Sequence, residues 1–167
     1  EKLKKEFEER GIVVIEQFLT RAQAEDMRRE MSEIVEREGT DETDGKIRQE
    51  ATSLGQIGVY SETFSNFARD PRLLDILEVL MGPNIELNHT KSVFKTADAP
   101  WGSPWHQDAV FWKGGTKITV GLVLSDSTLE NGCLQVVPES HREIKPHRDG
   151  RDFAKEVDPA IINPESV

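Results

Sequence analysis

The spacing of apolar residues along this chain of 167 residues changes near Gly82-Pro83. Before that point apolar side chains recur every three or four residues, which is the spacing of amphipathic helices. After it, apolar and polar residues alternate, as they do in half-buried strands. Helical spacing covers residues 2–10, 20–38, 61–68 and 70–82, and strand-like alternation covers 85–95, 117–125 and 132–137. Helices followed by strands predict an α+β fold, in which N-terminal helices flank a sheet or barrel.

Residue types at the ends of these segments support the predicted boundaries. Thr20 and Gln23 have the spacing of a capping box at the start of the second helix. Asp70-Pro71 puts proline at the first position of the fourth helix, and Gly82-Pro83 ends that helix. Asn131-Gly132 predicts a tight turn before the last strand.

The same spacing predicts which side chains form the core. The second and fourth helices each carry an apolar stripe, which consists of Ala24, Met27, Met31, Ile34 and Val35 in one and Leu73, Leu74, Ile76, Leu77, Val79 and Leu80 in the other. Residues 12–15 predict a further short strand, and the polar, glycine-containing residues 39–58 predict a loop.

Composition narrows the class of protein and of partner. The chain is long enough for one domain, which we place at residues 1–167, and no apolar run approaches the roughly 18 residues of a membrane span. The net charge of −10 argues against nucleic acid as a partner, because phosphate binding needs a basic face. The single Cys133 forms no internal disulfide, which fits a reducing, cytoplasmic location.

A candidate metal site follows the predicted strand 85–95, in the tripeptide His106-Gln107-Asp108. A histidine and a carboxylate two residues apart project to the same side of extended backbone. They supply two of the three ligands of the two-His-one-carboxylate triad, which leaves positions on Fe(II) open for oxygen and an organic molecule. The alternative is a surface turn in which Asp108 hydrogen-bonds His106.

The chain resembles phytanoyl-CoA dioxygenase-type enzymes, which are Fe(II)- and 2-oxoglutarate-dependent oxygenases. The resemblance spans roughly residues 5–150 and combines several ordered motifs. The matching segments are Phe64 to Pro71, Gly82-Pro83, Trp105 to Asp108, Phe111-Trp112, residues 117–125 and the run from Glu130 to Arg142. The resemblance implies a double-stranded β-helix core (a jelly-roll of the cupin type) with a mainly helical part at 1–83 and the first part of the β-helix at 84–167.

The resemblance also implies roles for individual residues. His106 and Asp108 would bind Fe(II), and the cosubstrates would be 2-oxoglutarate and O₂. Lys95, His89 and Gln107 are candidates for binding 2-oxoglutarate, and Lys91, Phe111 and Trp112 are candidates for lining the site of a small organic substrate. Each has a structural alternative: a solvated edge-strand lysine for Lys91 and Lys95, a packing histidine for His89, a structural amide for Gln107, and core aromatics for Phe111 and Trp112. An aspartate at position 108 favours hydroxylation or a related oxidation, because related halogenases have a small residue there.

The chain departs from the family pattern in three respects. A second metal-binding histidine, followed by a basic residue for 2-oxoglutarate, is expected downstream, and nothing after Arg151 resembles it. We therefore expect the C-terminal part of the barrel, with both residues, to be missing from this chain. Gly121 stands where many relatives have an aromatic residue, and Glu139 stands where glycine is common.

Two rival hypotheses remain at this stage. One is a catalytically inactive β-helix relative that binds a ligand or partner. The other is a cupin-like metal enzyme that uses His106 with His141 or His147 and needs no 2-oxoglutarate. The sequence does not indicate the substrate or the oligomeric state.

Overall fold

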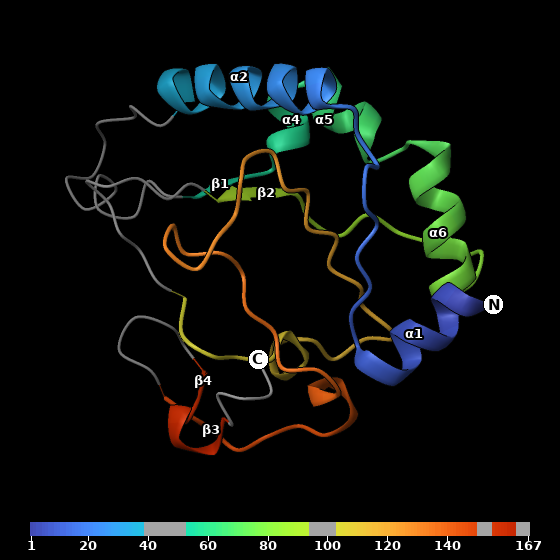
Figure 1. The fold of residues 1–167 in the computed structure, drawn as a ribbon, viewed down its shortest axis with the longest axis vertical. Coiled ribbons are helices and arrows are strands. Elements are labelled where there is room, and N and C mark those ends of the chain that lie inside the picture. The colour runs from blue at the N-terminus through green and yellow to red at the C-terminus, as the bar shows by residue number, and fades with distance from the viewer. Residues whose placement is uncertain (39–52, 94–102, 150–154, 163–167) are drawn as a thin grey trace. The chain divides into compact units, whose positions relative to one another are not determined.

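The structure is a computed structural model that describes residues 1–38, 53–93, 103–149 and 155–162 (Figure 1). Its helices are α1 (Lys2–Arg10), α2 (Arg21–Glu38), α4 (Ile57–Tyr60), α5 (Glu62–Phe67) and α6 (Pro71–Met81). Its strands are β1 (Ser53–Gly55), β2 (Lys91–Val93), β3 (His147–Arg148) and β4 (Glu156–Val157), and its 3₁₀ turns are η1 (Asp108–Phe111), η2 (Ser140–Arg142) and η3 (Pro159–Ile161). Among the described helices, none is both long enough and apolar enough to cross a membrane.

The contacts group the chain into two units, each built from segments distant in sequence. The helical unit consists of Gln17–Trp101 and Leu122–Gly132, and the terminal unit consists of Glu1–Glu16, Gly102–Gly121 and Cys133–Val167.

The predicted helix ends in the helical unit are confirmed. At the start of α2 the Thr20 N–H donates to Gln23 Oε1 at 2.9 Å, and the Gln23 N–H donates to Thr20 Oγ1 at 3.2 Å, which is a reciprocal capping box. At the start of α6 Asp70 Oδ1 accepts the Arg72 N–H at 2.9 Å. Gly82 ends α6 with a φ of 94°, a value that favours glycine.

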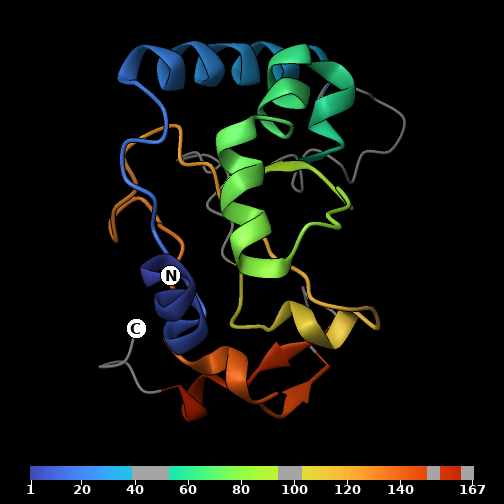
Figure 2. The same cartoon turned by 90° about the vertical axis from the view of Figure 1, so that its right-hand side faces the viewer.

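The core of the helical unit lies between α2 and the short helices α4 and α5, which run beside it (Figures 1 and 2). Its buried members are Met27, Met31, Ile34, Ile57 and Phe64, with Leu19, Phe67, Leu122 and Leu124 packed against them. The predicted stripe of α2 is therefore confirmed at Met27, Met31 and Ile34, and its methionines are packing residues, while Ala24 and Val35 are half-buried. In α6 Leu73 is buried as predicted, whereas Val79 is 45% exposed.

Ser61 joins two helices of this core through its side chain. Its Oγ accepts the Phe64 N–H at 3.1 Å, which caps α5, and donates to Glu30 Oε1 on α2 at 2.5 Å. The hydroxyl is buried, and both of its hydrogen-bonding functions are satisfied, as a buried polar group requires.

The strands are shorter than predicted. β1 and β2 pair antiparallel with Gly55 opposite Lys91, and β3 and β4 pair antiparallel with His147 opposite Val157. Of the predicted strand 85–95 only Lys91–Val93 lies in a sheet, and Lys95 lies outside the described residues. Residues 12–15, 117–125 and 132–137 have no regular secondary structure, so these strand predictions are wrong for this structure. The alternation of apolar and polar residues indicates which side chains face inward. A strand forms, however, only where a second backbone supplies its hydrogen bonds.

Side chains are alternately buried and exposed in parts of two predicted strands. In residues 122–124 the alternation holds, because Leu122 and Leu124 pack on the core and Val123 is 68% exposed. In β2, Ser92 is buried while Lys91 and Val93 are exposed, which favours the alternative of a solvated edge-strand lysine for Lys91. His89, two residues before β2, is exposed as well.

Two loop predictions have different outcomes. Asn131-Gly132 forms a turn as predicted, in which Gly132 has a φ of 80° and Asn131 Oδ1 accepts the Thr128 N–H at 2.8 Å. The predicted loop 39–58 contains β1 and the start of α4, and its residues 39–52 lie outside the described part of the chain.

In the terminal unit, the residues around η2 cap the C-terminal end of α1. The last carbonyls of a helix have no partner within the helix and carry partial negative charge. Three donors from residues 139–142 satisfy them. The bonds run from the Glu139 N–H to Arg10 O, from His141 Nε2 to Glu8 O and from Arg142 Nη2 to Glu9 O, at 2.8, 3.0 and 2.9 Å.

Gly11 makes this contact possible. It ends α1 in the left-handed region with a φ of 75°, and its N–H donates to Phe7 O at 2.8 Å. A Cβ on Gly11 would lie 2.3 Å from Nδ1 of His141, which is closer than real Cβ atoms approach. The imidazole therefore rests on a position that only glycine can occupy without displacing it.

Glu139 adopts a backbone conformation that suits glycine better, with a φ of 66° and a ψ of −3°. A side chain in this region costs about 1–2 kcal/mol, partly offset because glycine loses more entropy on folding. The ion pair of Glu139 with Arg142 spans 3.7 Å between exposed groups and contributes little. We expect Glu139→Gly to stabilise the protein by about 0.5–1 kcal/mol, measured as a rise in the urea midpoint. Glu139→Ala is the control, since it removes the carboxylate and keeps the Cβ; a midpoint that rises equally in both variants would contradict this reason.

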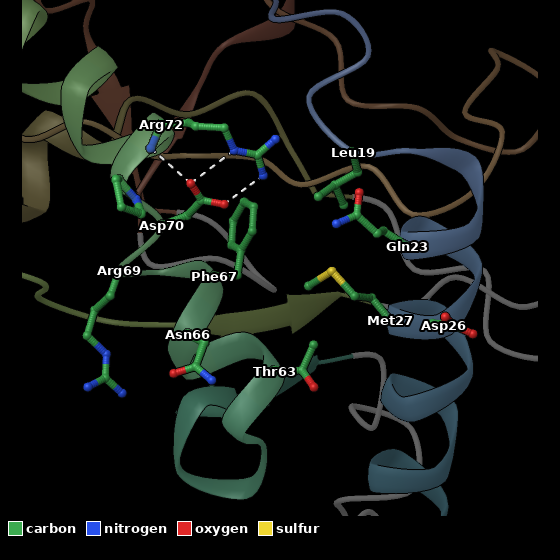
Figure 3. Close-up of a pocket in the computed structure, with 11 residues that line it drawn as sticks. Leu19, Gln23, Asp26, Met27, Thr63, Asn66, Phe67, Arg69, Asp70 and Arg72 are labelled. Carbon is green, nitrogen blue, oxygen red and sulfur yellow. Dashed lines mark hydrogen bonds and ion pairs between the residues drawn. The ribbon is translucent and has the colours of Figure 1, made fainter.

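A hollow of about 480 Å³ lies in the helical unit between α2 and the junction of α5 with α6 (Figure 3). Along one side Asp70 and Arg72 form an ion pair of 2.7 Å, drawn with dashed lines in Figure 3. The Arg72 guanidinium also lies 4.5 Å from the centroid of the Phe18 ring and donates to Phe18 O at 3.1 Å. Arg72 thus ties the start of α6 to the segment before α2.

The side-chain hydrogen bond from Arg72 holds the pKa of Asp70 below its ordinary value. A carboxyl whose pKa is lower in the folded state contributes stability above its unfolded pKa, and loses it as pH falls through the folded pKa. Asp70→Asn keeps a capping side chain but removes the charge. We expect its urea midpoint to lie below that of the wild type at pH 7, and the difference to shrink below about pH 4. Arg72→Gln should show the same convergence, and a constant difference down to pH 2.5 in both variants would contradict this assignment.

Candidate metal centre

His106 and Asp108, the two predicted ligands, lie close together in the terminal unit. The distance from His106 Nε2 to Asp108 Oδ1 is 3.6 Å, and the side chains are 27% and 52% exposed. Ligand atoms of a divalent metal lie about 2.1 Å from it, so two atoms 3.6 Å apart can bind one ion. The partial exposure leaves room for further ligands on the ion.

The protonation of His106 follows from its contacts. Its Nδ1 lies 2.8 Å from Pro104 O, and a carbonyl oxygen only accepts hydrogen bonds, so Nδ1 carries the proton. In the neutral form of the ring, the lone pair is then on Nε2, the atom that faces Asp108. A backbone carbonyl that fixes the tautomer of a ligand histidine in this way is a common feature of metal sites.

The carboxylate of Asp108 has a different support. Thr119 Oγ1 donates to Asp108 Oδ2 at 3.4 Å, while Oδ1 faces His106. The two oxygens therefore have separate surroundings, which suits a carboxylate that binds an ion through one oxygen. Asp108 is the first residue of η1, and Gln107 before it is extended, with φ and ψ of −122° and 122°.

Backbone hydrogen bonds hold the chain on both sides of His106. Trp105 O accepts the Val157 N–H of β4 at 2.7 Å. The Gln107 N–H donates to Nε2 of His147, in β3, at 3.3 Å. The hairpin of β3 and β4 thus fixes the peptides before and after the predicted ligand.

The side chain of Gln107 points into the segment 140–145. Its Nε2 donates to Ser140 O at 2.7 Å and to Glu143 O at 3.0 Å, and its Oε1 accepts the Lys145 N–H at 2.8 Å. Both functions of the amide are therefore engaged with backbone, which favours the structural alternative for Gln107. Its predicted contact with 2-oxoglutarate stays a prediction.

The two histidines considered as rival third ligands have other partners. Nδ1 of His147 donates to Lys145 O at 2.7 Å, and its Nε2 accepts from Gln107, so both ring nitrogens are in use. His141 donates through Nε2 to Glu8 O at the end of α1. Within the described ranges, no group of three or more His, Cys, Asp or Glu residues is placed to hold an ion. These contacts do not support a site built from His106 with either histidine.

The remaining predicted site residues are dispersed. His89 and Lys91 belong to the helical unit and are exposed, and Lys95 is outside the described residues. Phe111 and Trp112 follow Asp108 at the end of η1 and are 47% and 40% exposed, so in this structure they are not core residues. The roles of all five stay predictions.

Three supports of the site were not identified from the sequence: the Pro104 carbonyl, the Thr119 hydroxyl and the His147 imidazole. Pro104 lies two residues before His106, and because every residue has a backbone carbonyl, the residue type does not indicate this role. His147 was considered only as a ligand, although its position near the end of the motif-bearing region could have indicated a neighbouring role.

Comparison with known proteins gives a family and several relatives. Residues 7–163 match the family model described as phytanoyl-CoA dioxygenase (PhyH). The chain is 27% identical over 150 residues to an ectoine dioxygenase of Halomonas elongata, covering 84% of this chain and 45% of that protein. It is 30% identical over 96 residues to a protein of Stutzerimonas stutzeri named "Probable alpha-ketoglutarate-dependent hypophosphite dioxygenase", covering 54% and 32%.

It is also 31% identical over 87 residues to an L-proline trans-4-hydroxylase of Streptomyces griseoviridis, covering 48% of this chain and 32% of that protein. The chain thus spans between about a third and a half of the length of these curated relatives. No solved structure matches it.

Proposed function

Because the chain belongs to the phytanoyl-CoA dioxygenase family, we propose that its protein is an Fe(II)- and 2-oxoglutarate-dependent dioxygenase that oxidises a small organic molecule. The observation that carries the proposal is the convergence of His106 Nε2 and Asp108 Oδ1 at 3.6 Å, with the tautomer of His106 set for metal binding. The names of the relatives, which include an alpha-ketoglutarate-dependent dioxygenase and a proline hydroxylase, support the reaction class.

The residues present fit an Fe(II) ion. An imidazole nitrogen and a carboxylate oxygen are ligands that non-haem iron oxygenases use, and they leave open positions on the ion. Bound iron, with 2-oxoglutarate and O₂, would supply the oxidation. The protein's own part would be to present the lone pair of His106, to keep Asp108 Oδ1 free by engaging Oδ2 with Thr119, and to orient the substrate.

Five further residues are proposed to bind the organic reactants. Phe111 and Trp112, three and four residues after Asp108, present exposed aromatic surface, which suits contact with the apolar part of a substrate. Lys95, His89 and Lys91 carry or can carry positive charge, which suits the carboxylates of 2-oxoglutarate or an anionic substrate.

The family's fold is of the cupin or jelly-roll type, and we propose that this chain forms the first part of a double-stranded β-helix. Residues 117–125 and 133–137 support this, because they expose apolar side chains such as Val120 and Leu134 and form no strand in the described part of the chain. The relatives extend well beyond the matched region, which supports a third ligand and a basic residue for 2-oxoglutarate outside residues 1–167. The alternative of an inactive relative would bind a metal or ligand without turnover.

The metal assignment is tested in the full gene product that contains residues 1–167. We expect His106→Ala and Asp108→Ala to abolish the formation of succinate from 2-oxoglutarate, measured by chromatography, because each removes a ligand. Asp108→Gly should bind Fe(II) but not hydroxylate, since it frees one position on the ion. His141→Gln, which keeps a donor for the end of α1, is the control and should retain turnover. Turnover by His106→Ala at the wild-type rate would refute the assignment.

The role of Lys95 is tested by Lys95→Met, which keeps the aliphatic stem and removes the charge. The KM for 2-oxoglutarate should rise about tenfold or more, because one charge-assisted hydrogen bond contributes about 1.5–3 kcal/mol. Lys2→Met, at an exposed lysine of α1 outside the proposed site, is the matched control and should leave the KM unchanged. If KM and kcat of Lys95→Met both equal those of the wild type, Lys95 is a surface residue.

A further inference from the structure

His147 lies beside the metal pair, yet neither of its ring nitrogens faces a metal ligand. Nδ1 donates to Lys145 O at 2.7 Å, so Nδ1 carries the proton of a neutral imidazole. Nε2 is then an acceptor, and it receives the Gln107 N–H at 3.3 Å. The hydrogen bond that Nδ1 donates to Lys145 O thus determines the tautomer in which His147 can accept from Gln107.

The Gln107 peptide is the part of the backbone that connects the two ligands. A rotation of this peptide changes the direction of the Cα–Cβ bonds on both sides, and with it the separation of His106 Nε2 and Asp108 Oδ1. The side chain of Gln107 is held separately, by the backbone of residues 140–145. The backbone of Gln107 is held at two points, because its N–H donates to His147 Nε2 and its carbonyl accepts the Val110 N–H of η1, each at 3.3 Å. The contact with His147 is the one of the two that comes from outside this turn.

A second contact from the same hairpin holds the segment one peptide earlier. Val157 holds the Trp105 carbonyl at 2.7 Å, one peptide before His106. β3 and β4 pair with each other with His147 opposite Val157, so the two anchors lie across from one another in one hairpin. The β3–β4 hairpin therefore holds the backbone on both sides of His106. Val157 does so through its backbone N–H, and His147 does so through its side chain.

We propose that His147 is a positioning residue for the metal pair, which sets the separation of His106 and Asp108 by accepting the Gln107 N–H through Nε2. The inference rests on the proposed function, in that these two residues bind the metal. The hydrogen-bond acceptor at Nε2 is then the group that sets this separation, while the donor at Nδ1 serves to orient the imidazole ring. Residues that orient the ligands of a metal typically change its affinity about 10- to 100-fold when they are replaced.

Two substitutions separate the acceptor from the donor. In His147→Gln the amide oxygen can reach the place of Nε2 and accept from Gln107. In His147→Asn the shorter amide can replace only Nδ1, so it keeps a donor for Lys145 O and loses the acceptor. Binding of Co(II), a redox-stable substitute for Fe(II), is measured anaerobically on the full gene product by its visible absorption. We expect the Kd to rise about tenfold or more in His147→Asn and to stay within about threefold of the wild type in His147→Gln.

A purely structural role is distinguished by a control in the same unit. Lys4→Gly places glycine at an exposed position inside α1 and should lower the thermal midpoint. Lys4 lies away from the contacts of Gln107 and of residues 139–145, so the Kd for Co(II) should stay unchanged. If the Kd rises in Lys4→Gly as it does in His147→Asn, loss of stability explains both, and the proposal is wrong. An equal rise in His147→Gln and His147→Asn would also overturn it, as would no change in either.

The proposed function can fail separately from this inference. If His106→Ala binds Co(II) as tightly as the wild type, the metal assignment itself is wrong. If His106→Ala loses binding while both His147 variants keep wild-type affinity, only the role of His147 is wrong.

A measurement on the unaltered protein decides the case if the variants do not fold. Long-range proton–nitrogen NMR correlations report which ring nitrogen of His147 is protonated. The proposal requires the proton on Nδ1 and slow exchange of the Gln107 amide with solvent. A proton on Nε2, or an unprotected Gln107 amide, would overturn it without any substitution.

Discussion

The hydrogen bonds that hold residues 105–107 to the β3–β4 hairpin are the interactions on which the candidate site depends. A metal pair formed by two residues of one short segment has its geometry set by the backbone between them. Here that backbone is restrained at the Trp105 carbonyl and at the Gln107 N–H, while the Gln107 amide ties the segment to residues 140–145. These restraints fix how the side chains of His106 and Asp108 are oriented toward each other, because both are attached to this backbone.

Different kinds of interaction stabilise the two units. The helical unit contains nearly all of the buried apolar side chains of the described chain, grouped between α2, α4 and α5. In the described part of the terminal unit Val157 is the buried apolar residue, and polar contacts dominate. Capping of α1 by residues 139–142 and the bonds around Gln107 are examples. Such contacts are directional, so they suit a site that requires defined geometry, but each contributes only about 0.5–1.5 kcal/mol net.

Several residues with a catalytic residue type serve as structural supports here. His141 occupies the end of α1 and rests on Gly11, and His147 accepts a backbone hydrogen bond next to the metal pair. A histidine has one donor and one acceptor when neutral, so its two partners decide its role. The hydrogen-bond partners of both residues are backbone groups, which makes these histidines structural supports and not members of the predicted metal pair.

The sequence alone determined the local features of this protein. Helix ends at Thr20, Asp70 and Gly82, the buried stripe of α2, the turn at Asn131-Gly132 and the pairing of His106 with Asp108 depend on residues within a few positions of each other, so their types suffice to predict them. Tertiary structure decided which segments form strands, which way β2 faces, and that Gln107 is held by residues more than thirty positions away. These outcomes depend on where a second backbone or side chain lies in space, and the type of a single residue does not carry that information.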